Sequence, residues 1–177
     1  MKRLTDTDIQ ALYDKFNTPP HVKGHCAGVA QCALKLAKAL TDSDPENIHF
    51  DKDLIYGAGM VHDCARKFDF HEKVAAAELK RLGFLQESEI VSEHMKCNTY
   101  HDIDHVTEAD LLYISDRMVL EDTFVGLEKR FEYIRKKMIA FGRDPDNERS
   151  VQNRANAINF VASIEKKTGR SIFEICS

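Results

Sequence analysis

Apolar residues recur at intervals of three and four along most of this 177-residue chain, the spacing that lines one face of an α-helix. A first helix is predicted between a capping motif at Thr5 to Asp8 and the Thr18-Pro19-Pro20 segment, which ends it. Further helices are predicted at about 21–40, 52–64, 71–82, 86–95, 107–120, 126–141 and 147–167. No segment shows the alternation of apolar and polar residues that is typical of a strand, so we expect an all-α fold.

The segments between these helices are short and polar. Thr41–Phe50 and Cys97–Val106 are expected to be loops, and a break at Gly142–Pro145 separates the last two helices. Only 8 Gly and 4 Pro occur, with no low-complexity tract, which favours long helices over turn-rich β structure. Because there is no internal repeat and no long linker, we expect one domain spanning residues 1–177.

The charge balance narrows the classes of function. Lys and Arg number 25 against 29 Asp and Glu, and this net charge of -4 argues against a dedicated nucleic-acid-binding domain, which usually carries a basic surplus. A small phosphorylated metabolite is compatible with it, because such a ligand needs only a local basic patch. The polar start of the chain is unlike a signal peptide, and no apolar run approaches the roughly 18 residues that span a bilayer.

The cysteines indicate a reducing compartment. Their number is odd, at 5, and no Cys-x-x-Cys motif occurs, so neither a disulfide framework nor a four-cysteine zinc module is expected. Free thiols suit the cytoplasm. We therefore expect a cytoplasmic protein without a membrane partner.

Five side chains that can bind a metal lie on the apolar faces of predicted helices: His25, His62, His71, His94 and Asp116. Each is three or four residues from an apolar residue of its own helix and is expected to point inward. A single inward histidine is more often a hydrogen-bonded core residue than a ligand. Asp116 is harder to explain in that way, because a carboxylate facing the core is costly unless a cation or strong donors meet it. Its neighbour Arg117 is expected to point elsewhere, about 100° further round the helix.

Asp63 follows His62 directly, so a neutral nitrogen and an anionic oxygen, both ligands for Fe, Mn or Zn, share one short arc of an apolar helix. Together with the other inward-facing side chains, this pair favours a metal site over coincidence. The same dipeptide recurs at His101-Asp102, but in a polar loop. We interpret that second pair as lying in solvent; the alternatives are that its loop closes over the site or supplies a ligand in place of His94.

The order His25, His62-Asp63, Asp116 resembles the H…HD…D signature of the HD-domain superfamily of metal-dependent phosphohydrolases. The segments 22–40, 56–67 and 114–119 are similar to the family's first core helix, its small-residue-rich metal helix and the segment that holds its last aspartate. The resemblance covers most of residues 20–120. It implies an all-α HD-domain helical bundle with the metal site in its core, on which the C-terminal amphipathic helices at about 126–168 pack.

The resemblance also implies a set of ligands. The four residues of the signature bind a first metal in this family, and some branches bind two metals through additional histidines. His71 and His94 match those additional ligands in order and spacing, and Asp63 would then bridge the two ions. The expected cofactor is one or two divalent transition-metal ions (Fe, Mn, Co, Ni or Zn), with Mg as an alternative.

The function implied is that of a metal-dependent phosphohydrolase acting on a phosphate ester or anhydride of a small, nucleotide-type molecule. His62 and Asp63 would be its catalytic residues, with a metal-activated water attacking phosphorus and Asp63 orienting that water. The phosphates of the substrate are expected to contact nearby basic residues: Arg66, Lys67, Lys96 and Arg117. The basic run from Lys129 to Lys137 is interpreted as the solvated face of a long helix.

Two other functions stay open. A di-iron oxygenase of the HD type would use the full ligand set, including His71 and His94, and would bind iron in preference to other metals. A ligand sensor without catalytic activity would fit a broken ligand set better than the complete one in this sequence. The helices after Gly126 carry no chemical motif, and their apolar residues either cover the core or form a homodimer contact.

Overall fold

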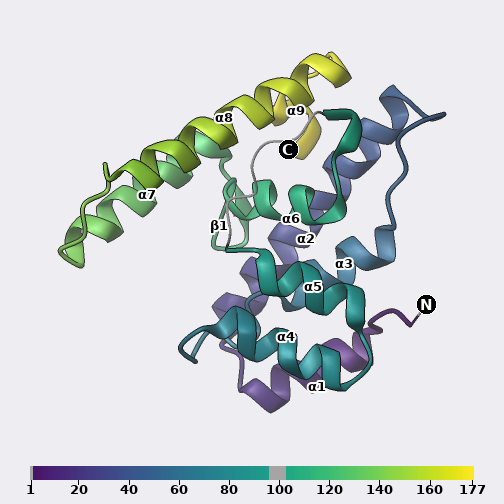
Figure 1. The fold of residues 1–177 in the computed structure, drawn as a ribbon, viewed down its shortest axis with the longest axis vertical. Helices are drawn as coiled ribbons and strands as arrows, with labels where there is room; N and C mark the ends of the chain where they lie inside the picture. The colour runs from purple at the N-terminus through teal and green to yellow at the C-terminus, as the bar shows by residue number, and fades with distance from the viewer. Residues whose placement is uncertain (1, 96–102) are drawn as a thin grey trace.

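The computed structural model describes residues 2–95 and 103–177, which fold into helices joined by short connections (Figure 1). The helices are α1 Asp6–Phe16, α2 Pro20–Ser43, α3 Lys52–Val61, α4 His71–Arg81, α5 Leu85–Glu93, α6 Glu108–Asp116, α7 Gly126–Ala140, α8 Glu148–Thr168 and α9 Ile172–Cys176. A 3₁₀ turn, η1, covers Ile103–His105, and the strands β1 Val119–Leu120 and β2 Thr123–Phe124 form a hairpin. The all-α expectation is confirmed. Within the described ranges, no helix combines the length and apolar character needed to cross a membrane.

Local capping explains where the first helices begin and end. At α1, the amide of Asp8 donates to the Thr5 side chain and the amide of Thr5 donates to the Asp8 carboxylate, which is the predicted capping box. α2 continues to Ser43, beyond its predicted end at Leu40. Polar residues alone do not end a helix, and the first residue after α2 that disfavours helical backbone is Pro45.

The prediction that no strand occurs, and that a helix continues to Leu120, is wrong at one place. α6 ends at Asp116, and β1 pairs with β2 in an antiparallel hairpin in which Val119 lies opposite Phe124. The turn between the strands holds Glu121 in the left-handed region, with φ 55°. Strands of two residues are too short to show an alternating pattern, so the sequence carries no strand signal there.

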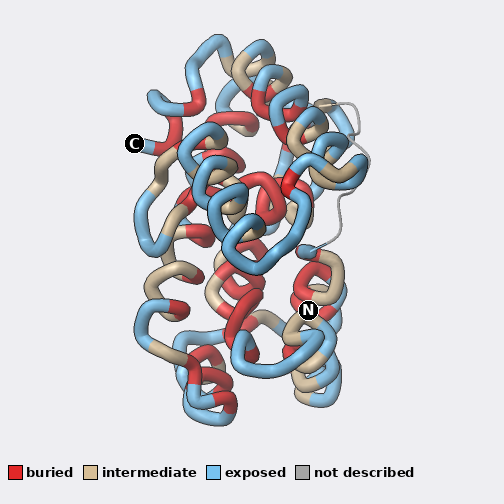
Figure 2. The backbone as a smooth tube through the Cα atoms, turned by 90° about the vertical axis from the view of Figure 1, so that its left-hand side faces the viewer, coloured by how far each residue is buried: buried red, intermediate tan, exposed pale blue. Residues whose placement is uncertain are grey.

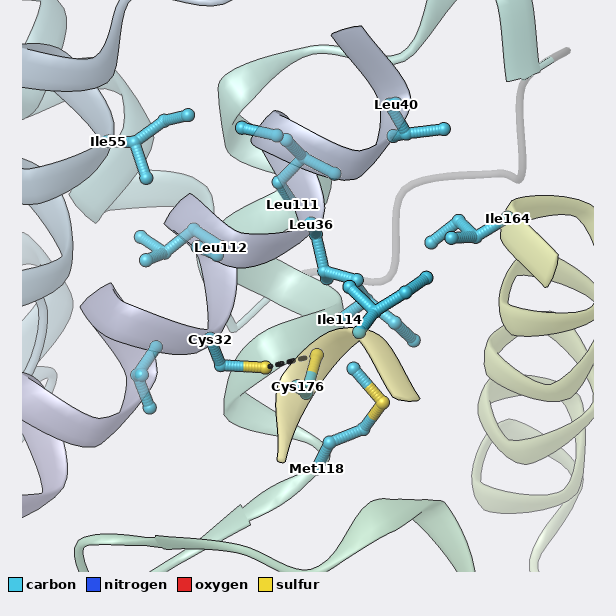
Figure 3. Close-up of a cluster of buried hydrophobic side chains, with 14 of the residues drawn as sticks. Cys32, Leu36, Leu40, Ile55, Leu111, Leu112, Ile114, Met118, Ile164 and Cys176 are labelled. Atoms are coloured by element: carbon cyan, nitrogen blue, oxygen red, sulfur yellow. Dashed lines mark hydrogen bonds between the residues drawn. The ribbon is translucent and has the colours of Figure 1, made fainter. Parts of the chain in front are cut away.

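A short C-terminal helix, α9, was also outside the predicted elements, because five residues are too few to show a helical period. Ser171 and Glu174 form a capping box across its first turn. Its last residue, Cys176, packs on α2, where its Sγ lies 3.5 Å from the Sγ of Cys32 (Figure 3). The backbone carbonyl of Cys176 also accepts a hydrogen bond from Lys35 Nζ at 2.9 Å.

α2 is the central element of the fold and contacts α3, α6, α8 and α9 (Figure 1). One buried apolar cluster surrounds it and includes Leu36, Leu40, Leu111, Ile114 and Ile164 (Figure 3). A second cluster is formed mainly by α1, α4 and α5. α3 belongs to both, since Ala58 lies in the first cluster and Val61 in the second. Figure 2 shows the buried residues gathered along the inward sides of the helices.

α2 and α3 approach each other closely at Gly59. A Cβ atom at this position would lie 2.7 Å from the Cβ of Ala30 and 2.8 Å from its Cα, so no side chain fits there. The approach brings His25 of α2 beside His62 at the end of α3, with their ring centroids 5.4 Å apart. The contact between these two helices therefore determines the geometry of the polar site.

α7 and α8 form an arm that extends away from the rest of the molecule (Figure 1). α7 buries Gly126 at its start, while the second half of α8 buries a row of apolar residues: Ala157, Phe160, Val161 and Ile164. Phe141, at the tip of the arm, is 70% exposed. The arm is thus anchored in the core at its base, and its outer part lies in solvent.

The change Gly59→Ala is expected to destabilise the fold by about 1–3 kcal/mol, because the added methyl group must displace the α2 backbone. Urea unfolding followed by circular dichroism measures this. The matched control is Gly24→Ala, a helical glycine of α2, whose Cβ would lie at an ordinary 3.5 Å from the Cβ of Asp122. The control should be neutral or stabilise by up to about 1 kcal/mol. Equal losses in both variants would contradict the close approach of α2 and α3.

Candidate metal centre

Three helices end at one place, and each brings a polar side chain there. His62 is the C-cap residue of α3, His94 is the C-cap residue of α5, and Asp116 is the last residue of α6. The partial negative charge at the C-terminus of a helix favours a cation nearby. His25 comes from the second turn of α2, and His71 is the first residue of α4.

The four histidine rings lie in one continuous row. Ring centroids are 5.4 Å apart for His25 and His62, 5.2 Å apart for His62 and His94, and 5.5 Å apart for His71 and His94. Asp63 and Asp116 contact the two end rings of this row, with Asp63 Oδ1 2.9 Å from His71 Nε2 and Asp116 Oδ1 3.0 Å from His25 Nε2. All the predicted ligands are therefore brought together.

The His62-Asp63 pair lies at the end of α3 rather than inside it. The predicted helix to Cys64 stops at Val61, and tight turns follow, in which Cys64 N donates to Val61 O and Arg66 N donates to Asp63 O. The ring of His62 explains the change, because its Nδ1 contacts the Gly59 carbonyl at 2.8 Å. A continued α-helix would need that carbonyl for the amide of Asp63.

Backbone carbonyls orient three of the rings. Nδ1 of His25 lies 3.0 Å from Glu121 O, Nδ1 of His62 lies 2.8 Å from Gly59 O, and Nδ1 of His94 lies 2.7 Å from Val91 O. A carbonyl oxygen only accepts hydrogen bonds, so each Nδ1 carries the proton and donates it. When the rings of His62 and His94 are neutral, Nε2 is left with a lone pair, which is the state of a metal-binding histidine. Nε2 of His25 instead donates to the Asp116 carboxylate at 3.0 Å.

Neither lone pair meets a hydrogen-bond donor in the described part of the chain; His62 Nε2 lies 3.9 Å and His94 Nε2 lies 3.5 Å from the Asp63 carboxylate, which only accepts. Nε2 of His62 and Nε2 of His94 are buried and accept no hydrogen bond from the part of the chain that the structure describes. His62 is 0% and His94 is 3% exposed, so bulk water does not solvate them. A buried polar atom without a partner costs about 1–3 kcal/mol. A metal ion would satisfy both atoms, and the donor set fits one.

Asp63 is shared by two groups of ligand atoms. One group consists of His25, His62 and Asp63, the other of Asp63, His71 and His94, and within each the atoms lie within 4.8 Å of one another. A carboxylate has two oxygens and can contact two cations at once. The buried groups can thus hold a metal ion, and their division around Asp63 suits two.

The surroundings keep the two carboxylates ionised. Burial alone would raise the pKa of Asp63, but its interactions with His62, His71 and His94 hold that pKa far below its usual range. For Asp116, burial also opposes ionisation, but the hydrogen bond with His25 and the charges of His62 and Arg117 together outweigh it and lower the pKa. Burial lowers the pKa of His62 to about 4, so its ring is neutral at pH 7. These are the protonation states that bind a metal.

The described residues that were predicted to bind phosphate lie in different surroundings. Nη1 of Arg66 lies 3.1 Å from both oxygens of Asp63, and this side chain is 43% exposed. Lys67 is exposed on the same loop, and Lys96 lies outside the described residues. Arg117, contrary to the prediction that it points away, places Nη1 3.6 Å from Asp116 Oδ2. It follows the last turn of α6 and folds back over the Tyr113 ring, 3.5 Å from its centroid.

Arg130 belongs to the site, although its basic run is predicted to be a solvated helix face. Its Nε donates to the backbone carbonyl of Asp116 at 3.2 Å, and its Nη2 lies 3.6 Å from Asp116 Oδ1. Its side chain is 16% exposed. One signal was present in the sequence: Arg130 is three residues after Leu127 and four before Ile134, so it lies on the partly buried face of α7.

Of the remaining histidines, those that the structure describes lie outside the centre, and the thiol next to Asp63 is protonated. His21, His49 and His105 are exposed, and His101 and Asp102 lie outside the described residues. Cys64 is buried beside Asp63, and burial raises its pKa to about 12. A protonated thiol is a poor ligand, so this cysteine is a small buried core residue.

Comparison with known proteins assigns no family. No protein-family model, no curated protein and no solved structure matches the chain. The function must therefore be argued from the centre itself: a row of four histidines, two ionised aspartates and three arginines that contact those aspartates.

We expect the protein to bind two divalent ions per chain when it is prepared with excess Mn or with Fe under exclusion of air. His94→Ala should reduce the content to about one ion, because it removes a ligand of one group only, whereas Asp63→Ala should remove most of both. Elemental analysis of dialysed protein measures this. His49→Ala, which removes an exposed histidine, is the control and should keep two ions. Unchanged metal content in both ligand variants would contradict the assignment.

Proposed function

We propose that this protein is a metal-dependent phosphohydrolase of the HD type, which cleaves a phosphate ester or anhydride of a nucleotide-type substrate with two metal ions. The observation that carries the proposal is the pair of buried Nε2 atoms of His62 and His94 that accept no hydrogen bond in the described residues and belong to the two ligand groups that share Asp63. Donor atoms arranged in this way fit a binuclear centre, and such centres are common in enzymes that act on phosphate.

The residues divide into two sets around the bridging carboxylate. His25, His62 and Asp116 would hold one ion with Asp63, while His71 and His94 would hold the other. A divalent metal supplies a water whose pKa is lowered toward neutrality and a positive charge that stabilises phosphoryl oxygens. The carbonyls of Glu121, Gly59 and Val91 keep three imidazoles in the tautomer that the ions need.

The arginines favour a phosphate substrate. Guanidinium groups bind phosphate through two parallel hydrogen bonds and stay charged at any physiological pH. Arg117 and Arg130 are mostly buried against Asp116, while Arg66 is half-exposed against Asp63. Arg66 can therefore turn from Asp63 to an incoming phosphate at little cost in burial.

The same six ligands would also serve a di-iron oxygenase, and the fold alone would serve a ligand sensor. Neither of these functions requires three cations at the edge of the centre. The guanidinium groups of Arg66, Arg117 and Arg130 are thus the reason to prefer a reaction of an anionic substrate.

Metal-replete protein is expected to release phosphate or a nucleotide from at least one member of a panel of nucleoside polyphosphates and phosphate esters assayed with Mn, Fe, Co, Ni and Mg. Arg66→Met should lower kcat/KM about ten- to hundredfold, since it removes a charge-assisted hydrogen bond of about 1.5–3 kcal/mol. Bound metal should not change. Arg143→Met, which alters an exposed arginine beyond α7, is the matched control.

Other results would replace the proposal. Oxygen consumption by the iron-loaded protein without phosphate release would indicate the oxygenase. Tight metal binding with neither reaction across the panel would indicate the sensor. Equal kinetic losses in Arg66→Met and Arg143→Met would contradict the role of Arg66.

A further inference from the structure

The loop that joins two of the candidate ligands exposes two phenylalanines. It runs from Cys64 to Phe70, between Asp63 and His71, and Phe68 is 49% and Phe70 is 69% exposed. The edge of Phe68 is held against Phe16 of α1, with ring centroids 5.9 Å apart. Large apolar side chains in solvent beside a polar centre are a typical feature of a ligand-binding surface.

The backbone conformation at position 70 is energetically unfavourable for a phenylalanine. Phe70 has φ 52° and ψ 43°, the left-handed region, which bulky residues rarely adopt and in which Gly or Asn is common. It is also the N-cap residue of α4 and makes no side-chain capping hydrogen bond, although Asn would supply one. Neither burial, nor backbone conformation, nor capping explains a phenylalanine there. Strained residues of this kind occur at ligand-binding sites.

The same loop lies at the open side of the centre. Among the charged side chains that contact Asp63 or Asp116 in the described ranges, Arg66 is 43% exposed and the others are 16% or less. Phe70 is bonded directly to His71, whose Nε2 lies 2.9 Å from Asp63 Oδ1. Lys73 Nζ lies 5.2 Å from the centroid of the Phe70 ring, which adds a cation to this side.

We propose that Phe70, with Phe68 beside it, stacks against the base of a nucleoside polyphosphate whose phosphates reach the metal centre past Arg66. The inference rests on the proposed phosphohydrolase function and specifies its substrate. An aromatic ring stacks on any base, and phenylalanine offers no hydrogen bond that would distinguish one base from another. The loop would thus favour substrates that carry a base over base-free phosphates, without selecting a particular base.

The chain contains no tryptophan, so Phe70→Trp introduces a single tryptophan whose emission reports on this position. Titration of the metal-replete variant with ATP is expected to quench its emission in a saturable way, whereas inorganic tripolyphosphate should leave it nearly unchanged. Phe141→Trp, at the tip of the arm, is the matched control because Phe141 is 70% exposed. Its emission should respond to neither compound.

Kinetics provide the second readout. Phe70→Gly keeps the left-handed backbone and removes the ring. KM for a nucleotide substrate should then rise about tenfold, while kcat/KM for tripolyphosphate should stay unchanged. Phe70→Trp, which replaces the ring with another aromatic ring, should restore the nucleotide KM. Equal effects on both substrates, or quenching by both, would overturn the stacking role. If nothing is hydrolysed but ATP alone quenches, the phosphohydrolase proposal fails while the base site stands. If nucleotides are hydrolysed with no quenching, only the base site fails.

A different feature, on α8, points to self-association. Opposite its buried face, α8 exposes a second apolar row at spacings of four, three and four: Val151, Ala155, Ile158 and Ala162. Val151 is 47% and Ile158 is 54% exposed. This spacing is typical of a helix that packs along another helix. α8 runs along the edge of the molecule, so its outer side is open to a second chain (Figure 1).

The exposed apolar row of α8 fits the same row of a second copy when the two helices are antiparallel. In an antiparallel pair, Val151 lies opposite Ala162 of the second copy and Ile158 lies opposite its Ala155, so each large side chain meets a small one. The ends of the row carry an acid and a base each, Glu148-Arg149 and Glu165-Lys166. Glu148 and Lys166 flank the row on the same side, so the antiparallel arrangement brings Glu148 near Lys166 of the second copy at each end, whereas an in-register parallel arrangement would place like charges beside each other.

We infer that two copies of this chain associate through antiparallel packing of α8. Sedimentation velocity at tens of micromolar is expected to show a dimer. Ile158→Lys should shift it to monomer, while Ile139→Lys, which alters an isoleucine of α7 that is 57% exposed, should not. A monomeric parent protein, or a dimer that Ile158→Lys leaves intact, would overturn the inference.

The charges at the ends provide a test of orientation. Glu148→Lys alone places like charges at both ends of the antiparallel pair and should weaken the dimer about tenfold. Glu148→Lys combined with Lys166→Glu restores opposite charges and should recover the affinity of the parent protein. Additive weakening in the double variant would contradict the antiparallel arrangement.

Discussion

The arrangement of the helices around the centre depends on how the buried carboxylate of Asp63 is balanced. An isolated buried carboxylate would be neutralised or would destabilise the fold, so donors and cations must surround it. Arg66 contacts Asp63 from the solvent side, and His71, at the start of α4, lies 2.9 Å from Asp63 Oδ1. His62, at the end of α3, and His94, at the end of α5, face the same carboxylate with Nε2, and these groups can hold a metal ion beside it. The second apolar cluster holds these helices together and thereby fixes the distances to Asp63.

His62 and His94 lie at the ends of helices rather than on helix faces, and this position determines the tautomer of their imidazole rings. At a C-terminus, backbone carbonyls have no helical amide to bind, and a histidine one turn later can donate to them through Nδ1. His62 and His94 make this same contact, to the carbonyl three residues before each. The contact fixes the tautomer, ends the helix and directs Nε2 into the centre, so one local geometry accomplishes what would otherwise need separate carboxylate partners. For His25, which lies inside α2, the hairpin supplies the carbonyl, and Glu121 adopts a left-handed backbone to place it.

The sequence was sufficient to predict the features that depend on periodic spacing. The inward direction of His25, His62, His94 and Asp116 follows from apolar neighbours three and four residues away, and the structure brings these side chains together. Contacts between residues that lie far apart in the sequence could not be predicted. Arg130 lies far along the chain from His25, and only the fold places both against Asp116. The hairpin and α9 are too short to show a period, although each contributes contacts to α2.

The position of Arg130 links the arm to the centre. Arg130 lies near the start of α7, where its guanidinium contacts Asp116, while the rest of α7 extends into solvent beside α8. The buried face of α8 packs on α2, the helix that carries His25, so both helices of the arm end on elements that supply ligands. A partner on the outer face of α8 would hold the arm in place on the core. Because Arg130 belongs to α7, such a contact would also fix the position of one of the cations beside Asp116.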